Sequence, residues 1–348
     1  MDKYIDKIVS TIGDYRKEDS VRIDHEYVKS WLNQFDKKDQ KPLVMELSHI
    51  LPQSYLSKTA FIDNIKKALT EISEDCGYLD VNKFVADTKF LSCQGDDKSQ
   101  TAFLHLLNEA TMRIFDVSIH QCDESHAKNW FYIDDVLASG KTFYDEFSKE
   151  IDSFGVEQYK SRSIKTICLF HFFHSWGYAN KIKLLRNRYE LSDDSMSAYY
   201  FRLIENNPDP SEHGGELSFN HVYPIESDFA VAFLNGLPER IGKEYIKYNR
   251  EKAFRQSGQP ISEKFFSSPQ ARNAYEDIVL RMGIYIMDKV DHFDVPSIRP
   301  LGMVPPSYMT LGTGSHAFTW RNISNTCPLI FWWESNGWIP LFPVKGRG

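Results

Sequence analysis

Cysteines are few in this sequence, and none of them forms a Cys-x-x-Cys pair. Five cysteines occur in 348 residues; the odd number argues against a disulfide framework, and the missing pairs argue against a zinc ribbon. No run of 18 apolar residues exists, so we expect no membrane span. Residues 1–7 carry acids and lack the apolar centre of a secretion signal. These absences predict a cytoplasmic protein.

Glycine and proline are also scarce, with 18 and 15 residues, which argues against a long disordered tract. Aromatic residues are abundant instead (24 Phe, 18 Tyr and 7 Trp) and supply the surface for a large core. The net charge of −7 disfavours a dedicated nucleic-acid binder. We therefore expect contact with nucleic acid only through a partner.

The first 80 residues are predicted to be helical. Apolar residues recur there at the spacing of a buried helical stripe in segments 28–35, 43–51 and 61–72. Asp75-Cys76-Gly77 is typical of a helix end. The expected organisation is a helical module over residues 1–80 and an α/β domain over residues 81–348.

Beyond residue 80, short apolar runs alternate with helical patterns. Strands are expected at 89–93, 130–133 and 164–170, and helices at 99–112, 142–151 and 178–189. This alternation is typical of a parallel sheet flanked by helices. A helix is expected at 271–290. The segment 318–342 holds four of the seven tryptophans in β-type runs broken by Asn336-Gly337, a hairpin signal, and predicts a C-terminal β-containing hood.

One segment combines features of a ligand site. Asp134 and Asp135 follow the apolar run at 130–133, and a loop of small residues then leads into a helix. Ligands of open α/β sheets bind beyond the carboxyl ends of the strands, and a helix start favours anions. The acids would repel a phosphate, so we expect them to hold sugar hydroxyls or a hydrated Mg²⁺ beside it. A P-loop is excluded, because it requires glycine where Asp135 stands.

Residues 133–142 resemble the phosphoribosyl-pyrophosphate (PRPP) signature of type I phosphoribosyltransferases and depart from it only at Ser139 and Lys141. The resemblance implies that Asp134 and Asp135 hold the ribose 2′- and 3′-hydroxyls and serve Mg²⁺. It implies that the 5′-phosphate is wrapped by Ala138, Ser139, Gly140, Lys141 and Thr142. Lys141 could strengthen phosphate binding or face solvent. The alternative is a surface turn with two solvated acids.

A second element fits the same resemblance. The fold places a pyrophosphate loop after an earlier strand, and Gln94, Gly95 and Asp96 occupy that place. Gly95 lets the backbone turn toward the pyrophosphate. Lys98 could pair with the pyrophosphate and absorb its charge as it leaves. Taken alone, such a turn is common.

Residues 31–36, the signature and the tail at 325–343 are together similar to phosphoribosyltransferase-like proteins of bacterial conflict systems, which accompany anti-phage loci including some retrons. The resemblance implies a Mg²⁺-dependent effector enzyme acting on PRPP or a ribose 5-phosphate nucleotide, restrained by a protein from the same locus. The alternative is a non-catalytic sensor of PRPP or nucleotide, or a partner-binding protein, with the same fold. The two departures, and the absence of an evident acceptor-activating base, keep that alternative open beside the enzyme.

Weaker patterns leave alternatives open. Three residues in the segment that precedes the signature strand are either zinc ligands, which their spacing permits, or ordinary loop residues: His120, Cys122 and His126. His171 and His174 are expected to pack or to meet solvent. One helix has a basic face, which is either solvated or binds nucleic acid or an acidic partner: Lys181, Lys183, Arg186 and Arg188. Residues 299–315 form a lid or an ordinary loop, and the terminal tryptophans form core or a partner interface.

Overall fold

The computed structural model describes residues 1–95, 99–206, 219–246, 252–290, 295–334 and 337–344. The chain forms two compact units, one of residues Lys58–Leu203 and one of Met1–Ser57 with Ile204–Gly348. The boundary expected at residue 80 does not coincide with this division. Helix α4 (Lys58–Asp75) belongs to the first of these units, where the ring of Phe61 contacts that of Phe103 on α6 (Ser99–Phe115) at 4.8 Å.

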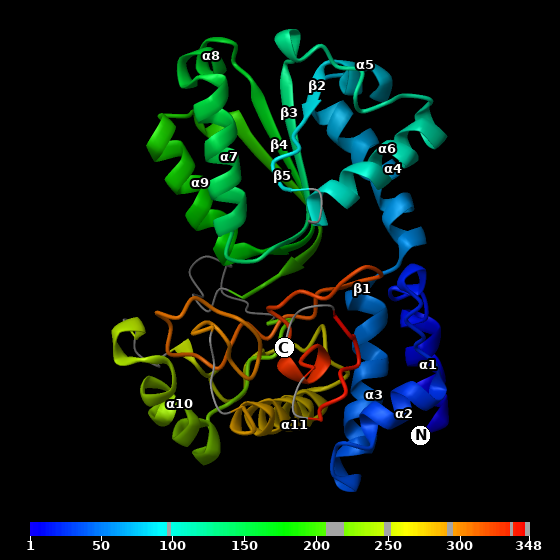
Figure 1. Cartoon of the computed structure of the whole chain (residues 1–348), viewed down its shortest axis with the longest axis vertical. Coiled ribbons are helices and arrows are strands. Elements are labelled where there is room, and N and C mark those ends of the chain that lie inside the picture. The colour runs from blue at the N-terminus through cyan, green and yellow to red at the C-terminus, as the bar shows by residue number, and fades with distance from the viewer. Residues whose placement is uncertain (96–98, 207–218, 247–251, 291–294, 335–336, 345–348) are drawn as a thin grey trace. The chain divides into compact units, whose positions relative to one another are not determined.

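The unit of residues 58–203 is built on a four-stranded sheet in the order β2-β3-β4-β5. The strands are β2 (Thr88–Phe90), β3 (Asn129–Leu137), β4 (Lys165–His174) and β5 (Met196–Ile204). Strand β3 pairs in parallel with both β2 and β4. Figure 1 shows α7 (Lys141–Phe154), α8 (Val156–Ser161) and α9 (Ser175–Tyr189) on one side of the sheet, and α4, α5 (Val81–Ala86) and α6 on the other. This is the predicted fold class.

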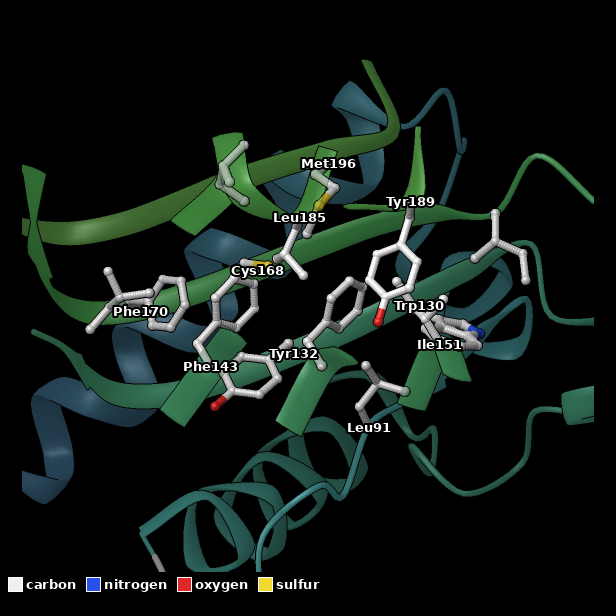
Figure 2. Close-up of a cluster of buried hydrophobic side chains, with 14 of the residues drawn as sticks. Leu91, Trp130, Tyr132, Phe143, Ile151, Cys168, Phe170, Leu185, Tyr189 and Met196 are labelled. Atoms are coloured by element: carbon white, nitrogen blue, oxygen red, sulfur yellow. The ribbon is translucent and has the colours of Figure 1, made fainter. Parts of the chain in front are cut away.

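The central strands are apolar because both of their faces are covered. Figure 2 shows one such interface, where Tyr132 and Phe170 of the sheet meet Phe143 of α7. The rings of Tyr132 and Phe143 lie 5.0 Å apart, edge to face. Leu185 and Tyr189 bring α9 into the same cluster. The helices that follow β3 and β4 are therefore fixed by aromatic packing against the strands that precede them.

The other unit joins the two ends of the chain. Its elements are α1 (Asp2–Ile12), α2 (His25–Leu32), α3 (Lys37–Ser54), β1 (Tyr55–Leu56), α10 (Asp228–Ile241), α11 (Pro269–Asp288) and β6 (Phe318–Thr319). The indole N–H of Trp31 donates to the carbonyl of Ile330 at 3.0 Å. Strand β1 pairs in parallel with β6. The expected helices at 28–51 thus share one core with the tail.

Most of the tail residues expected to form strands do not form them in the part of the tail that the structure describes. In that part of 318–342, strand structure is limited to β6, and Leu329–Phe331 is a 3₁₀ turn. Asn336 of the predicted hairpin lies outside the described residues. The indole of Trp332 donates to the carbonyl of Cys327 at 2.7 Å, and local bonds of this kind take the place of a strand ladder. The tail tryptophans are buried, which favours the core interpretation: Trp320, Trp332, Trp333 and Trp338.

The segment 299–315 is held by one buried cation. The guanidinium of Arg299 donates to the carbonyls of Pro296 at 2.7 Å and Ile298 at 2.9 Å. It also reaches the carbonyls of Pro306 and Tyr308. Each such bond fixes a backbone group that would otherwise be solvated. These contacts favour an ordinary ordered loop over a lid.

Candidate functional site

The two adjacent acids lie within strand β3. The sequence predicted a strand end at Ile133, but the ladder continues through the pairs Asp134 with Phe170 and Leu137 with Phe173. The apolar residues after the acids allow this extension, because β4 offers Phe172 and Phe173 as partners. Asp134 is 8% exposed, whereas Asp135 is half-buried. The alternative of two solvated acids is therefore wrong for Asp134.

The carboxylate of Asp134 accepts hydrogen bonds at both of its oxygens. The side-chain amide of Gln94 donates to Oδ2 at 3.1 Å, and the hydroxyl of Tyr132 reaches the same oxygen at 3.3 Å. The backbone N–H of Asp135 donates to Oδ1 at 2.9 Å. Burial, followed by the neighbouring Asp134 carboxylate, raises the pKa of Tyr132 well above 10. Tyr132 thus stays protonated and keeps donating, which fixes a negative charge at this point of the sheet.

The loop that carries Gln94 is tied down by the helix that follows it. The backbone N–H groups of Cys93 and Gln94 donate to Oε1 of Gln100 at 2.8 and 3.1 Å. The hydroxyl of Thr101 donates to the carbonyl of Gly95 at 3.1 Å. Two predicted pyrophosphate-loop residues, Gln94 and Gly95, are thereby placed on the β2–α6 connection, and Gln94 contacts Asp134. Asp96 and Lys98 lie outside the described residues.

The predicted 5′-phosphate loop connects β3 to α7. Gly140 has a φ of +68° at the start of α7, in the left-handed region that favours glycine. The first turn of α7 contains no acid, so the positive end of the helix dipole is not neutralised within it. Ser139 and Thr142 are exposed, and the hydroxyl of Ser139 accepts from the N–H of Lys141 at 3.4 Å. Ala138 is half-buried and Gly140 buried. The loop can thus offer hydroxyls and backbone N–H groups to an anion.

Lys141, which departs from the signature, points along its own helix. Its ammonium forms an ion pair with Asp145 one turn further on, and its side chain is 75% exposed. Of the two interpretations of Lys141, the structure favours the one in which this residue faces solvent. An exposed pair at this spacing contributes only about 0.3–0.5 kcal/mol to stability.

The sequence did not single out several residues that shape this region. Gln100 and Thr101 hold the first loop, and Tyr132 holds Asp134. Gly177 of α9 lies against the second loop: a Cβ on it would stand 1.9 Å from the carbonyl oxygen of Ala138. Polar residues at the start of α6 and a glycine in the first turn of α9 were the available signals. The roles of these residues become evident only from the tertiary contacts that they make.

The weaker histidine patterns do not form sites. His126 pairs with Asp123 at 2.8 Å, and no cluster of three metal-ligating side chains occurs in the described part of the chain. His171 and His174 of β4 are buried, and their ring nitrogens have no hydrogen-bond partner among the described residues. Burial lowers the pKa of His174 to about 3. Both histidines pack as neutral rings.

Comparison of the sequence with models of known protein families shows to which family the chain belongs. The PRTase-CE family model matches residues 28–344, which includes both loops and Asp134. The chain belongs to the PRTase-CE family. It is therefore a phosphoribosyltransferase-like protein. No curated protein and no solved structure matches it. None of the described helices of this PRTase-CE protein is long and apolar enough to cross a membrane.

Proposed function

We propose that this PRTase-CE protein binds PRPP or a ribose 5-phosphate nucleotide with Mg²⁺ and transfers the phosphoribosyl group. The observation that carries the proposal is the contact between Gln94 and Asp134, which joins the β2–α6 loop to the acid pair. The loop at 138–142 begins three residues after Asp135 on the same strand. Segments suited to pyrophosphate, to ribose hydroxyls and to phosphate thus follow one another at one edge of the sheet.

The acid pair suits Mg²⁺. This ion is usually held by one or two carboxylates, with waters and substrate phosphates completing its shell. Asp134 and Asp135 supply that number. Mg²⁺ bound with the substrate would neutralise charge on the departing pyrophosphate. Asp135 is the more accessible of the two acids.

Each segment has a separate task in the proposed transfer. The loop 138–142 anchors the 5′-phosphate, and Gln94 holds Asp134 in place beside the ribose. As the bond from C1′ to pyrophosphate breaks and a bond from C1′ to the nucleophile of an acceptor molecule forms, positive charge develops on the sugar. The carboxylates of Asp134 and Asp135 stabilise this charge, and pyrophosphate leaves. Lys98, outside the described residues, is proposed to absorb charge on the leaving group.

The proposal is tested by isothermal titration with PRPP and with ribose 5-phosphate, each with and without Mg²⁺. We expect Mg²⁺-dependent binding by the wild type and at least a tenfold loss of affinity in Asp134→Asn/Asp135→Asn. Glu146→Gln on α7 is the matched control, because it removes a nearby negative charge that pairs with Lys149. Equal binding by the wild type and the double variant contradicts the proposal.

A second candidate is a sensor that binds the same ligand without turnover. It is favoured by the two donors, Gln94 and Tyr132, that already engage Oδ2 of Asp134, because an occupied acceptor is less available to a substrate hydroxyl. Incubation with PRPP, nucleotides and NAD, followed by mass spectrometry, separates the two candidates. New products support the transferase; ligand recovered unchanged supports the sensor.

We propose further that the protein is a cytoplasmic anti-phage effector restrained by a partner from its own locus. The resemblance of residues 31–36, 133–142 and 325–343 to conflict-system proteins supports this role. Trp31 and the tail tryptophans are buried, so we do not assign the partner to them. Expression without the neighbouring genes should slow bacterial growth, and Asp134→Asn/Asp135→Asn should restore growth at an equal level of folded protein. Equal toxicity of the variant and the wild type contradicts this role.

A further inference from the structure

The loop between β3 and α7 packs directly on the first turns of α9. A Cβ on Gly177 would stand 1.9 Å from the carbonyl oxygen of Ala138, and a Cβ on Gly140 would stand 2.7 Å from Cγ of Lys181. Two glycines thus allow loop and helix to touch. Lys181 follows Gly177 by four residues, which places both on one face of α9. The aliphatic stem of Lys181 therefore lies against the loop.

Lys181 carries a charge that the surrounding carboxylates do not neutralise. Among the described residues its ammonium contacts only the ring of Tyr144, at 5.6 Å from the ring centre. The other cations nearby are committed: Arg186 pairs with Asp193, Arg188 with Asp152, and Lys141 with Asp145. The side chain of Lys181 is half-buried, so part of its hydration is lost without an ion pair in exchange. Such a charge is suited to an anionic ligand.

We propose that Lys181 makes the loop at 138–142 specific for a phosphate monoester, so that the protein selects phosphorylated sugars over their unphosphorylated forms. The ligand class is a pentose or nucleoside with a terminal phosphate. The loop supplies hydroxyls and N–H groups, which any acceptor can use, whereas Lys181 supplies the charge that distinguishes phosphate from a neutral group. The inference rests on the proposed function for its sugar, but its phosphate step is independent.

Two titrations test the role of Lys181. In the first, inorganic phosphate is added to the full chain, and the amide signals of Ser139, Gly140 and Thr142 are followed by NMR. In the second, the affinities for ribose 5-phosphate and for ribose are compared by calorimetry in the presence of Mg²⁺. We expect Lys181→Gln to lose at least tenfold in affinity for both phosphate ligands and to lose the dependence of binding on salt. Lys181→Arg should retain most of the affinity.

Lys183→Gln is the matched control, because Lys183 lies two residues further along α9 and is exposed. This variant should leave both titrations unchanged. A phosphate response equal in the wild type and Lys181→Gln overturns the inference, as does a wild-type loop that millimolar phosphate does not perturb. If Lys181→Gln lowers the phosphate response while Asp134→Asn/Asp135→Asn leaves ribose 5-phosphate binding intact, the inference stands and the proposed function fails. If Lys181→Gln leaves the phosphate response unchanged while Asp134→Asn/Asp135→Asn loses ribose 5-phosphate binding, the proposed function stands and the role of Lys181 is rejected.

Discussion

The side-chain amide of Gln94 lies 3.1 Å from Oδ2 of Asp134, although 40 residues separate them in the sequence. The contact crosses from the β2–α6 loop to strand β3. Because the acceptor is a buried carboxylate, this bond is stronger than one between neutral groups. The position of the first loop and the charge of the acid pair are thereby coupled.

Replacing Gln94 with Glu should break this coupling without changing the shape of the side chain. Two carboxylates would then share the space around Oδ2 of Asp134, and their repulsion would raise the pKa of the pair. We expect the free energy of unfolding at pH 7.5 to fall by about 1–3 kcal/mol, and most of the loss to vanish at pH 5. Urea unfolding at both pH values measures this. Gln158→Glu, an exposed change on α8, should show no such dependence.

Asp134→Ala should destabilise the protein, because the carboxylate that it removes is buried and accepts hydrogen bonds. The variant leaves the Tyr132 hydroxyl and the Gln94 amide without this acceptor. Loss of a buried partner costs about 1–3 kcal/mol, whereas Asp135→Ala, at a half-buried position, should cost less than about 1 kcal/mol. Thermal and urea unfolding of the two variants will show whether the order is as expected.

Gly177→Ala should displace the loop at 138–140. Its new Cβ would overlap the carbonyl of Ala138, and overpacking of this kind costs about 1–3 kcal/mol. Affinity for ribose 5-phosphate should fall in parallel. Gly236→Ala in α10 is the control: a Cβ there meets nothing within 4 Å, so the same change should stabilise by about 1 kcal/mol. Destabilisation of similar size in both variants would refute the steric account.

His174 should make the protein sensitive to acid. Its pKa is 6.5 as the reference value and about 3 in the folded chain, because burial disfavours the charged ring. Between these values the unfolded state binds a proton that the folded state does not, so stability falls as the pH drops from 6.5 towards 3, by up to about 1.4 kcal/mol per pH unit. His174→Leu should reduce that slope in urea unfolding across pH 7 to 4. His120→Leu, at an exposed position, should leave it unchanged.

The apolar runs predicted the strands of the central sheet because parallel strands are covered on both faces. Strand β5 escaped prediction, since Ser197 and Tyr200 in it are exposed and its apolar run is interrupted. In the tail, the expected strands are limited to β6 among the described residues. The β-type residues of the tail are aromatic, and what they require is burial rather than a ladder.

The sequence predicted the acid pair and both loops from their places along the chain: Asp134 continues an apolar run, Gln94 follows another, and Gly140 precedes a helix. Their mutual contacts could not be predicted. The bond between Gln94 and Asp134 and the approach of Gly177 to Ala138 depend on how three connections pack, and a single sequence contains no record of this. Lys181 appeared only as one member of a basic helix. Arg186 and Arg188 form ion pairs with carboxylates, whereas the ammonium of Lys181 contacts the ring of Tyr144.

The shared core of the chain's two ends has a consequence for the order of synthesis. The indole of Trp31 can form its hydrogen bond only after Ile330, 299 residues later, has been synthesised. At about 5–20 residues per second, the first helices emerge from the ribosome roughly 15–60 s before the tail that completes their core. Residues 58–203 have all their own sheet partners by then. The sheet is therefore expected to form first on the ribosome. Until the tail is synthesised, the amino-terminal helices expose apolar faces that chaperones can bind.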